Sequence, residues 1–194
     1  MRGEYGRTDN IPMSEKTPAN ASDSIRYQGK AVDDPAWIET FLSEQRTGVV
    51  GLVDDEKPHL VTQLFVYDEG SIYVHGAQDG RAYEIVEATE PAPTCFTTSE
   101  MGRFIPADEP VNFTVEYASV VAYGTTSFLE ERAEKRRVLE QFMSKFAPQL
   151  TVGEDYEEMT DESIDRTAVY RLDVDSWSGK RGEKPADHPG AYDL

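Results

Sequence analysis

Three short apolar segments, separated by tight turns and followed by a helix, restrict the fold of this chain more than any other feature. They cover residues 48–53, 60–67 and 71–75 and are rich in the β-branched and aromatic residues that favour strands. The breaks between them are too short for a helical crossover, so neighbouring strands are expected to run antiparallel. A polar loop over residues 76–82 then leads into a helix at 83–88.

The loop before this helix has the composition of an anion-binding junction. Helix N-termini carry unpaired backbone N–H groups and a partial positive charge, so they hold anions well. Arg81, in the first turn, adds a fork of donors suited to phosphate. Most glycine-containing loops are simple turns, so the residues alone leave two alternatives: a plain turn, or a site for a phosphorylated ligand.

The rest of the chain adds further strands and two more helices. Asp34 and Pro35 predict the start of a helix that Gly48 closes, and residues 130–147 have the clearest amphipathic pattern. The remaining predicted segments are a strand through Cys95 and Phe96, a loop at 99–110, extended segments at 111–117 and 119–128 with a bulge or bend at Gly124, an acidic loop at 151–163 and a last strand at 168–174.

Antiparallel strands with segregated helices indicate a mainly β, α+β fold, unlike the alternating βαβ pattern of doubly wound proteins. Closure of a sheet removes exposed strand edges, so we predict a six-stranded antiparallel split β-barrel with flanking helices. One domain is expected over residues 25–181, between a flexible N-terminal tail at 1–24 and a polar C-terminal tail at 182–194.

Acidic residues outnumber basic ones along the whole chain. Asp and Glu number 37 against 19 Lys and Arg, which gives a formal net charge of −18. This charge argues against nucleic acid and anionic membranes as partners. The single cysteine, Cys95, excludes an internal disulfide and fits a reducing cytoplasm. No apolar stretch reaches the length of a transmembrane helix, so we expect a cytoplasmic protein.

Three motifs, in the predicted order, resemble a known family. They are His75–Arg81 after the third strand, Tyr117–Gly124 in the extended segments and Ser178–Arg181 after the last strand. Together they are similar to the pyridoxamine 5'-phosphate oxidase-like flavoproteins, in the flavin-nucleotide-binding or nitroimidazole-resistance-type branch. The resemblance spans residues 34–181 and implies a split β-barrel that pairs as a homodimer, with FMN bound at the interface.

The resemblance also implies which residues hold the cofactor. They are Val61, Thr62 and Gln63 along the isoalloxazine edge, His75 and Gly76 beside the ribityl chain and phosphate, Arg81 on the phosphate, Ser119 where related oxidases carry a glutamine, and Trp177 from the carboxyl end, on the same or the partner subunit. This sequence departs from the branch at Ala82, where a second basic residue is usual, and at Gln63, where proline is common. The terminal arginine motif of true pyridoxamine phosphate oxidases is missing.

An FMN-dependent oxidoreductase acting on a small molecule is the function that this resemblance implies, because the flavin itself supplies the redox chemistry. His75 is the candidate catalytic acid, since histidine titrates near neutrality, and a structural histidine is the alternative. Two other classes stay open: a module that only binds or stores flavin, haem or a deazaflavin, and an interaction protein without a cofactor. His59, His75, Asp79 and Glu84 match no zinc spacing, so no metal is expected.

The evenly spread acidity predicts a protein adapted to high salt, because counterions screen the self-repulsion of an acidic surface. We expect the melting temperature to rise from low to molar KCl. Thermal melts followed by circular dichroism at increasing KCl measure this. A melting temperature that stays flat or falls with salt contradicts a halophilic origin.

Overall fold

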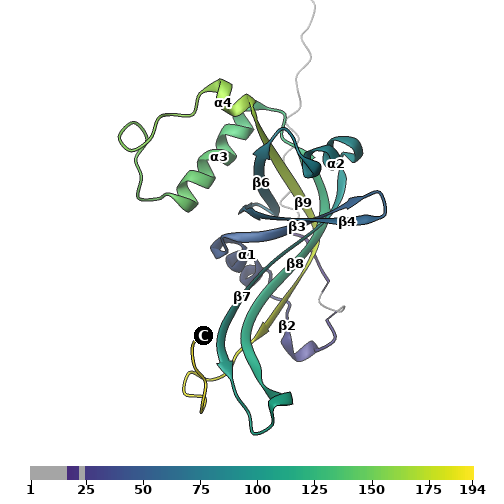
Figure 1. Ribbon diagram of the computed structural model, residues 1–194, viewed down its shortest axis with the longest axis vertical. Coiled ribbons are helices and arrows are strands. Elements are labelled where there is room, and N and C mark those ends of the chain that lie inside the picture. The colour runs from purple at the N-terminus through teal and green to yellow at the C-terminus, as the bar shows by residue number, and fades with distance from the viewer. Residues whose placement is uncertain (1–16, 22–24) are drawn as a thin grey trace, which may run out of the picture.

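The computed structural model describes residues 17–21 and 25–194 as a β-barrel that continues into a long three-stranded extension (Figure 1). The flexible tail predicted for residues 1–24 therefore falls largely outside the described residues. Within that range, β1 (Ala19–Asn20) pairs in parallel with β9 (Thr167–Gly182). Part of the predicted tail thus belongs to the sheet.

A ring of antiparallel strands forms the barrel. Besides β9, its members are β3 (Thr47–Asp54), β4 (Lys57–Leu64), β5 (Val66–Asp68), β6 (Ser71–Ala77), β7 (Ala92–Ile105) and β8 (Thr114–Phe128). They follow the order β4-β3-β7-β8-β9-β6-β5, and β4 leads into β5 through Phe65 alone. β4 and β5 therefore act as one bent strand that closes the ring. The predicted mainly β, antiparallel split barrel is confirmed, with six strands when this bent strand is counted once.

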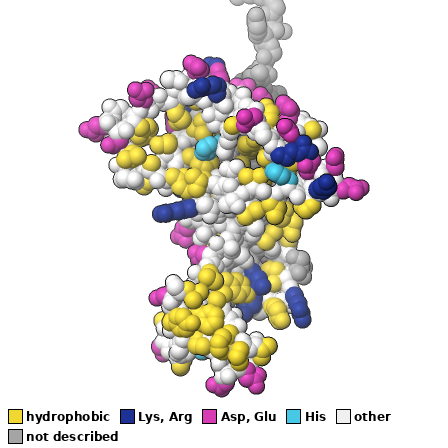
Figure 2. Space-filling view, in the orientation of Figure 1, with side chains coloured by type: hydrophobic (Ala, Val, Ile, Leu, Met, Phe, Trp, Pro, Cys, Tyr) yellow, Lys and Arg dark blue, Asp and Glu magenta, His cyan; other side chains and the backbone are white. Residues whose placement is uncertain are grey.

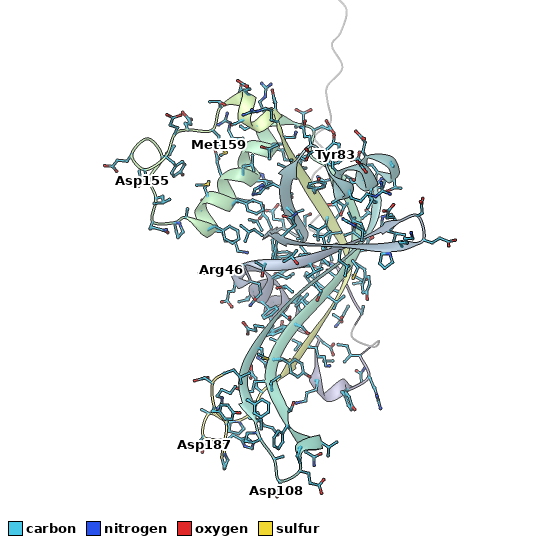
Figure 3. All side chains as sticks on the ribbon, viewed as in Figure 1. Arg46, Tyr83, Asp108, Asp155, Met159 and Asp187 are labelled. Atoms are coloured by element: carbon cyan, nitrogen blue, oxygen red, sulfur yellow. The ribbon has the colours of Figure 1, made fainter. Side chains whose placement is uncertain are left out.

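Three strands are longer than the barrel needs. β7, β8 and β9 run for 14, 15 and 16 residues, and their far ends project from the barrel as the extension (Figure 1). β2 (Ala31–Val32) pairs with β9 along this part. Asp108 and Asp187 mark its tip in Figure 3, where the C-terminal segment returns and Tyr192 forms a bridge with Phe104.

The loop predicted from residue 99 onward is wrong over its first half. Residues 99–105 belong to β7, because they continue the pairing with β8 that includes Ser99 and Ser119. The register shifts between Met101 and Phe104. The glycine and charges in this stretch therefore mark a bulge within a strand, which has the same local composition as a loop.

The last strand is also longer than predicted, because β9 continues past residue 174 to Gly182 along the edge of β8. The bulge predicted at Gly124 is confirmed by a register shift between Tyr123 and Gly124. A β-carbon at Gly124 would overlap the carbonyl oxygen of Asp173, so the close approach of β9 requires glycine there.

Helices cover the barrel on several sides. They are α1 (Pro35–Glu44), α2 (Arg81–Thr89), α3 (Arg132–Phe146) and α4 (Asp161–Asp165), with 3-10 turns at Gln28–Lys30 and Pro110–Asn112. Asp34 caps α1 as predicted, with its carboxylate accepting a hydrogen bond from the N–H of Ala36 at 3.0 Å. The predicted closure of this helix by Gly48 is wrong. Gly48 lies in β3, where a side chain would overlap the ring of Phe96.

Two apolar clusters hold these elements together. The larger one fills the barrel and extends beneath α1, and it includes Phe65, Phe96 and Trp177, all almost completely buried. The smaller one lies beneath α3, where Val138 and Phe142 pack against the outside of β6 and β9. The helices thus bury one stripe each against the sheet, as amphipathic helices do.

One face of the sheet remains exposed and apolar. The register places alternate residues of β3, β4, β7 and β8 on the outside of the barrel. We call this the outer sheet face, defined by the exposed side chains of Val53, Leu60, Leu64, Met101 and Tyr123. So many exposed large apolar side chains on one side are typical of an interaction surface.

Candidate functional site

The barrel is open between β4 and β6, which lie on either side of the closing bend and are not neighbours in the sheet. A cavity of about 120 Å³ occupies this gap, which we call the barrel opening. The partly or fully exposed residues at its mouth are Val61, Gln63, Gly76, Ala77, Asp79 and Ala82, and the buried floor is formed by Val50, Leu52, Ile72, Val74, Val86, Phe96, Thr126, Tyr170 and Leu172.

The floor of the opening is apolar apart from two hydroxyl groups. The hydroxyl of Thr126 accepts a hydrogen bond from the hydroxyl of Thr94 at 2.8 Å, so its polar atom is already satisfied. Burial raises the pKa of Tyr170 to about 12, which keeps this phenol neutral. An uncharged, largely apolar floor is suited to the apolar part of a ligand.

The mouth of the opening is formed by the start of α2. Gly80 is the N-cap residue, with φ +87°, and no side chain caps the helix. A β-carbon on Gly76 or Gly80 would meet no atom within 4 Å, so the space beside this backbone is open. Backbone N–H groups of the first helical turn are therefore approachable by an anion, as the sequence predicted.

Arg81 lies in this first turn but is held by two carboxylates. Its Nε donates to Oδ2 of Asp54 at 2.6 Å, its Nη2 bonds to Oδ1 of the same residue, and its Nη1 contacts Glu84 at 2.9 Å. The hydrogen bond from Arg81 lowers the pKa of Asp54, and the same bond raises the pKa of the guanidinium. The Arg81 side chain as a whole is 52% exposed.

His75 lies on the opposite side of β6 from the cavity. Its ring meets the ring of Phe142 edge-on, with 4.6 Å between centroids, beneath α3. Burial there lowers the pKa of His75 and favours the neutral imidazole. Val74 and Gly76 line the opening, and strand alternation turns the residue between them away from it. The protomer geometry thus favours the structural alternative for this histidine.

The other predicted site residues divide among three places. Val61, Gln63 and Gly76 meet at the opening, with Arg81 beside them in the adjoining helical turn. Thr62 and Ser119 are on the outer sheet face, on strands separated by β3 and β7.

Trp177 is only 1% exposed and packs in the core near Tyr67, with 6.3 Å between ring centroids. Its side chain is therefore not presented to any ligand on the protomer surface.

Several residues of the opening were not singled out by their sequence. Thr126 and Tyr170 lie far along the chain, and only the pairing of β8 with β9 brings them beneath the α2 start. Asp79 lies in the predicted loop. A carboxylate next to an expected phosphate does not indicate a binding residue, so the sequence did not identify it. Ala82 was noted only as a missing positive charge, yet its small side chain leaves the mouth open.

No group of three or more His, Cys, Asp or Glu side chains in the described ranges is arranged to hold a metal ion. Within those ranges, no helix has both the length and the apolar character to cross a bilayer.

A closed antiparallel barrel with one side opening and an uncapped helix start defines a split β-barrel protein. The chain belongs to the pyridoxamine 5'-phosphate oxidase family, whose sequence model matches residues 34–181. No curated protein matches the chain at a significant level. The family match covers the barrel, the extension and all of the predicted site residues.

Solved structures with the same fold are similar at low sequence identity. The flavocytochrome Anf3 from Azotobacter vinelandii is 24% identical, with a TM-score of 0.74 over 87% of this chain and 78% of that one. An FAD and heme binding protein from Mycobacterium smegmatis is 20% identical, with a TM-score of 0.71 over 85% and 84%. A putative 5-nitroimidazole antibiotic resistance protein from Bacteroides thetaiotaomicron is 22% identical, with a TM-score of 0.65 over 78% and 86%.

The buried position of His75 predicts a measurable pH dependence of stability. Because its pKa is lowered in the fold, the unfolded chain takes up a proton at this residue first as the pH falls through about 6.5. The stability that this neutral, buried imidazole allows is therefore fully present above about pH 6.5. The free energy of unfolding falls as the pH drops below that value. We expect the free energy of unfolding to fall more between about pH 7.5 and 5.5 in the wild type than in His75→Gln. Urea titrations at both pH values measure this, and equal falls would place the imidazole in solvent.

Proposed function

We propose that this protein binds a flavin, in the form of FMN, at the barrel opening and uses it as an oxidoreductase acting on a small molecule. The observation that carries the proposal is the coincidence of three features at one place. The family match spans the opening, the helix start is uncapped there, and three of the expected cofactor residues meet at its mouth. A flavin, when bound, supplies the hydride and electron chemistry, so a catalytic triad is not needed.

The dimensions of the opening indicate how a flavin would fit. A cavity of about 120 Å³ is smaller than the roughly 300 Å³ of the smallest usual ligand pockets. The ring system would therefore lie across the mouth, with only a small apolar substituent directed inward. β4 is an edge strand that pairs only with β3. The backbone groups on its other edge, over residues 61–63, are therefore placed to hydrogen-bond the edge of a ring.

The phosphate end of the ligand would lie at the start of α2. Open space beside Gly76 and Gly80 leaves room for it, and Arg81 is the nearest guanidinium. Asp54 and Glu84 already neutralise much of that positive charge. With Ala82 in place of a second cation, the backbone N–H groups would carry a larger share of phosphate binding than in relatives with two basic residues.

A homodimer would complete this site. A ring lying across a shallow mouth leaves one face in water unless another surface covers it. The outer sheet face adjoins the opening along β4 and carries exposed apolar side chains, including Leu60 and Tyr123. Two copies pairing through this face would bury those side chains, and would bring Ser119 of each chain to the interface.

Leu60 offers a direct test of this dimer. It is 68% exposed in the protomer, so a charge there is harmless to the isolated fold but costly within an apolar interface. We expect a dimer for the wild type and a monomer for Leu60→Glu by size-exclusion chromatography with light scattering. Leu150→Glu, at an exposed leucine in the loop after α3 and outside the outer sheet face, should remain dimeric. A monomeric wild type, or a dimeric Leu60→Glu, would contradict the arrangement.

Arg81 offers a test of the phosphate position. Hydrogen bonds to charged groups contribute about 1.5–3 kcal/mol, so Arg81→Ala should bind FMN at least about tenfold more weakly in fluorescence titrations. Asp54→Asn should bind it more tightly, because it releases the guanidinium from its carboxylate partner. Arg46→Ala, at the exposed arginine labelled in Figure 3, is the matched control and should leave the affinity unchanged. Unchanged FMN affinity in Arg81→Ala would remove this residue from the site.

Turnover separates the proposed enzyme from the non-catalytic alternatives. A yellow protein that bleaches with NAD(P)H and passes electrons to an acceptor supports the oxidoreductase. A yellow protein that no donor and acceptor pair turns over supports a binding or storage module. The named relatives give haem as a further ligand to test, because one is a flavocytochrome and another binds FAD and heme. A colourless protein that ignores FMN, haem and deazaflavin would contradict both the enzyme and the binding module, and would support an interaction protein without a cofactor.

A further inference from the structure

A second groove lies at the opposite end of β8 and β9 from the barrel opening. It has a volume of about 280 Å³ and is bordered by Tyr117 near the start of β8, Gly182 at the end of β9, and the 3-10 turn that ends at Lys30. We call it the lysine groove, defined by the side chains of Tyr27, Lys30, Tyr117, Lys180 and Lys184. Figure 2 shows Lys and Arg side chains along this lower part of the molecule, next to hydrophobic ones.

The lysine groove is positively charged in a chain of net charge −18. Two carboxylates also line it, but each is already matched by an arginine. Glu116 accepts two hydrogen bonds from Arg103, at 2.7 and 2.8 Å, and this pairing lowers its pKa to about 2. Glu183 lies 3.6 Å from Arg181. In the described part of the chain none of the three groove lysines forms an ion pair, so their charges are uncompensated.

The shape of the groove depends on a close approach at Gly182. A β-carbon there would be 2.8 Å from the ring of Tyr117 and 3.4 Å from Nζ of Lys30. Nζ of Lys180 lies over the same ring, 5.2 Å from its centroid. The Lys180 ammonium thus lies over the Tyr117 ring, and the Lys30 ammonium lies close to the space that a side chain at position 182 would fill.

Arg103 fixes the third lysine in place. Its guanidinium donates to the carbonyl oxygens of Lys184, Pro185 and Ala186 at 2.8 to 3.2 Å. The N–H of Lys184 also donates to Glu116 at 2.8 Å. The chain after β9 is therefore held against the groove by an arginine that lies outside the lining.

We propose that the lysine groove binds a nucleoside phosphate, with its phosphates between the lysines and its base on a tyrosine. Lysine ammonium groups bind phosphate as point charges, and aromatic rings stack with bases irrespective of base identity. Tyr27 is 60% exposed and Tyr117 borders the groove, so a tyrosine ring is available for the base beside the lysines that would bind the phosphates. At about 280 Å³ the groove lies just below the roughly 300 Å³ of the smallest usual ligand pockets, so a bound nucleotide would be only partly enclosed. This assignment does not depend on a flavin at the barrel opening.

Calorimetric titration of the full chain with ADP at fixed low ionic strength tests the proposal, because salt screens such contacts. We expect saturable binding to the wild type and at least a tenfold loss of affinity in Lys30→Gln/Lys180→Gln. Lys57→Gln, which removes an exposed lysine from the start of β4, should bind like the wild type. No binding by the wild type, or equal binding by the double variant, would overturn the proposal.

Related probes separate a nucleotide site from a simple anion site. ADP should bind more tightly than adenosine, ribose 5-phosphate or inorganic pyrophosphate, and Tyr117→Leu should reduce its advantage over pyrophosphate. Pyrophosphate binding as tightly as ADP, or a short RNA binding more tightly, would overturn the nucleotide assignment. FMN titrations in the lysine variants should be unchanged, and ADP titrations in Arg81→Ala likewise. The flavin proposal and the nucleotide proposal can therefore be contradicted independently of each other.

Discussion

The bend at Phe65 is the constraint on which the rest of the structure depends. This residue is fully buried, its ring packs edge-on against Phe96 with 4.8 Å between centroids, and its N–H bonds back to Arg46. Lys145 of α3 donates to the carbonyl of Phe65 at 3.1 Å and lies over its ring. These contacts satisfy the backbone N–H and carbonyl of Phe65, where the bent strand changes its partner from β3 to β6. Burial at this place lowers the pKa of Lys145 to about 8. Because the bend parts β4 from β6, it both closes the barrel and creates its opening.

The opening therefore results from the same bend that closes the barrel, and it is the place where we propose that a ligand binds. The pair between Arg81 and Asp54 connects the start of α2 to the end of β3 across this gap. It therefore fixes the mouth while it competes for the guanidinium that a phosphate would need. A surface ion pair of this kind contributes little to stability, so its rearrangement on ligand binding costs little. With Ala82 in place of a second cation, the proposed phosphate would depend on Arg81 and on the backbone N–H groups of the first helical turn.

Local patterns in the sequence predicted the elements well, but they did not predict which side chains meet. Alternation and turn residues identified β3, β6 and β8, and Asp34 with Pro35 located α1. Gly102 and the charges around it read as a loop because a bulge has the same composition, and only pairing with β8 distinguishes the two. His75 and Gly76 are adjacent in sequence yet face opposite sides of β6. Thr126 and Tyr170 reach the opening through long-range pairing, which single-sequence periodicity does not encode.

Arginine and lysine have different roles in this acidic chain. Every ion pair in the described part of the chain is made by an arginine, whose planar fork suits paired carboxylates. The lysines of the groove are instead left without carboxylate partners, although 37 acidic residues compete for them. An uncompensated cluster of like charges costs folding energy through repulsion. A bound anion that neutralises the cluster would remove that cost, so the repulsion among the lysines would favour binding of the proposed ligand.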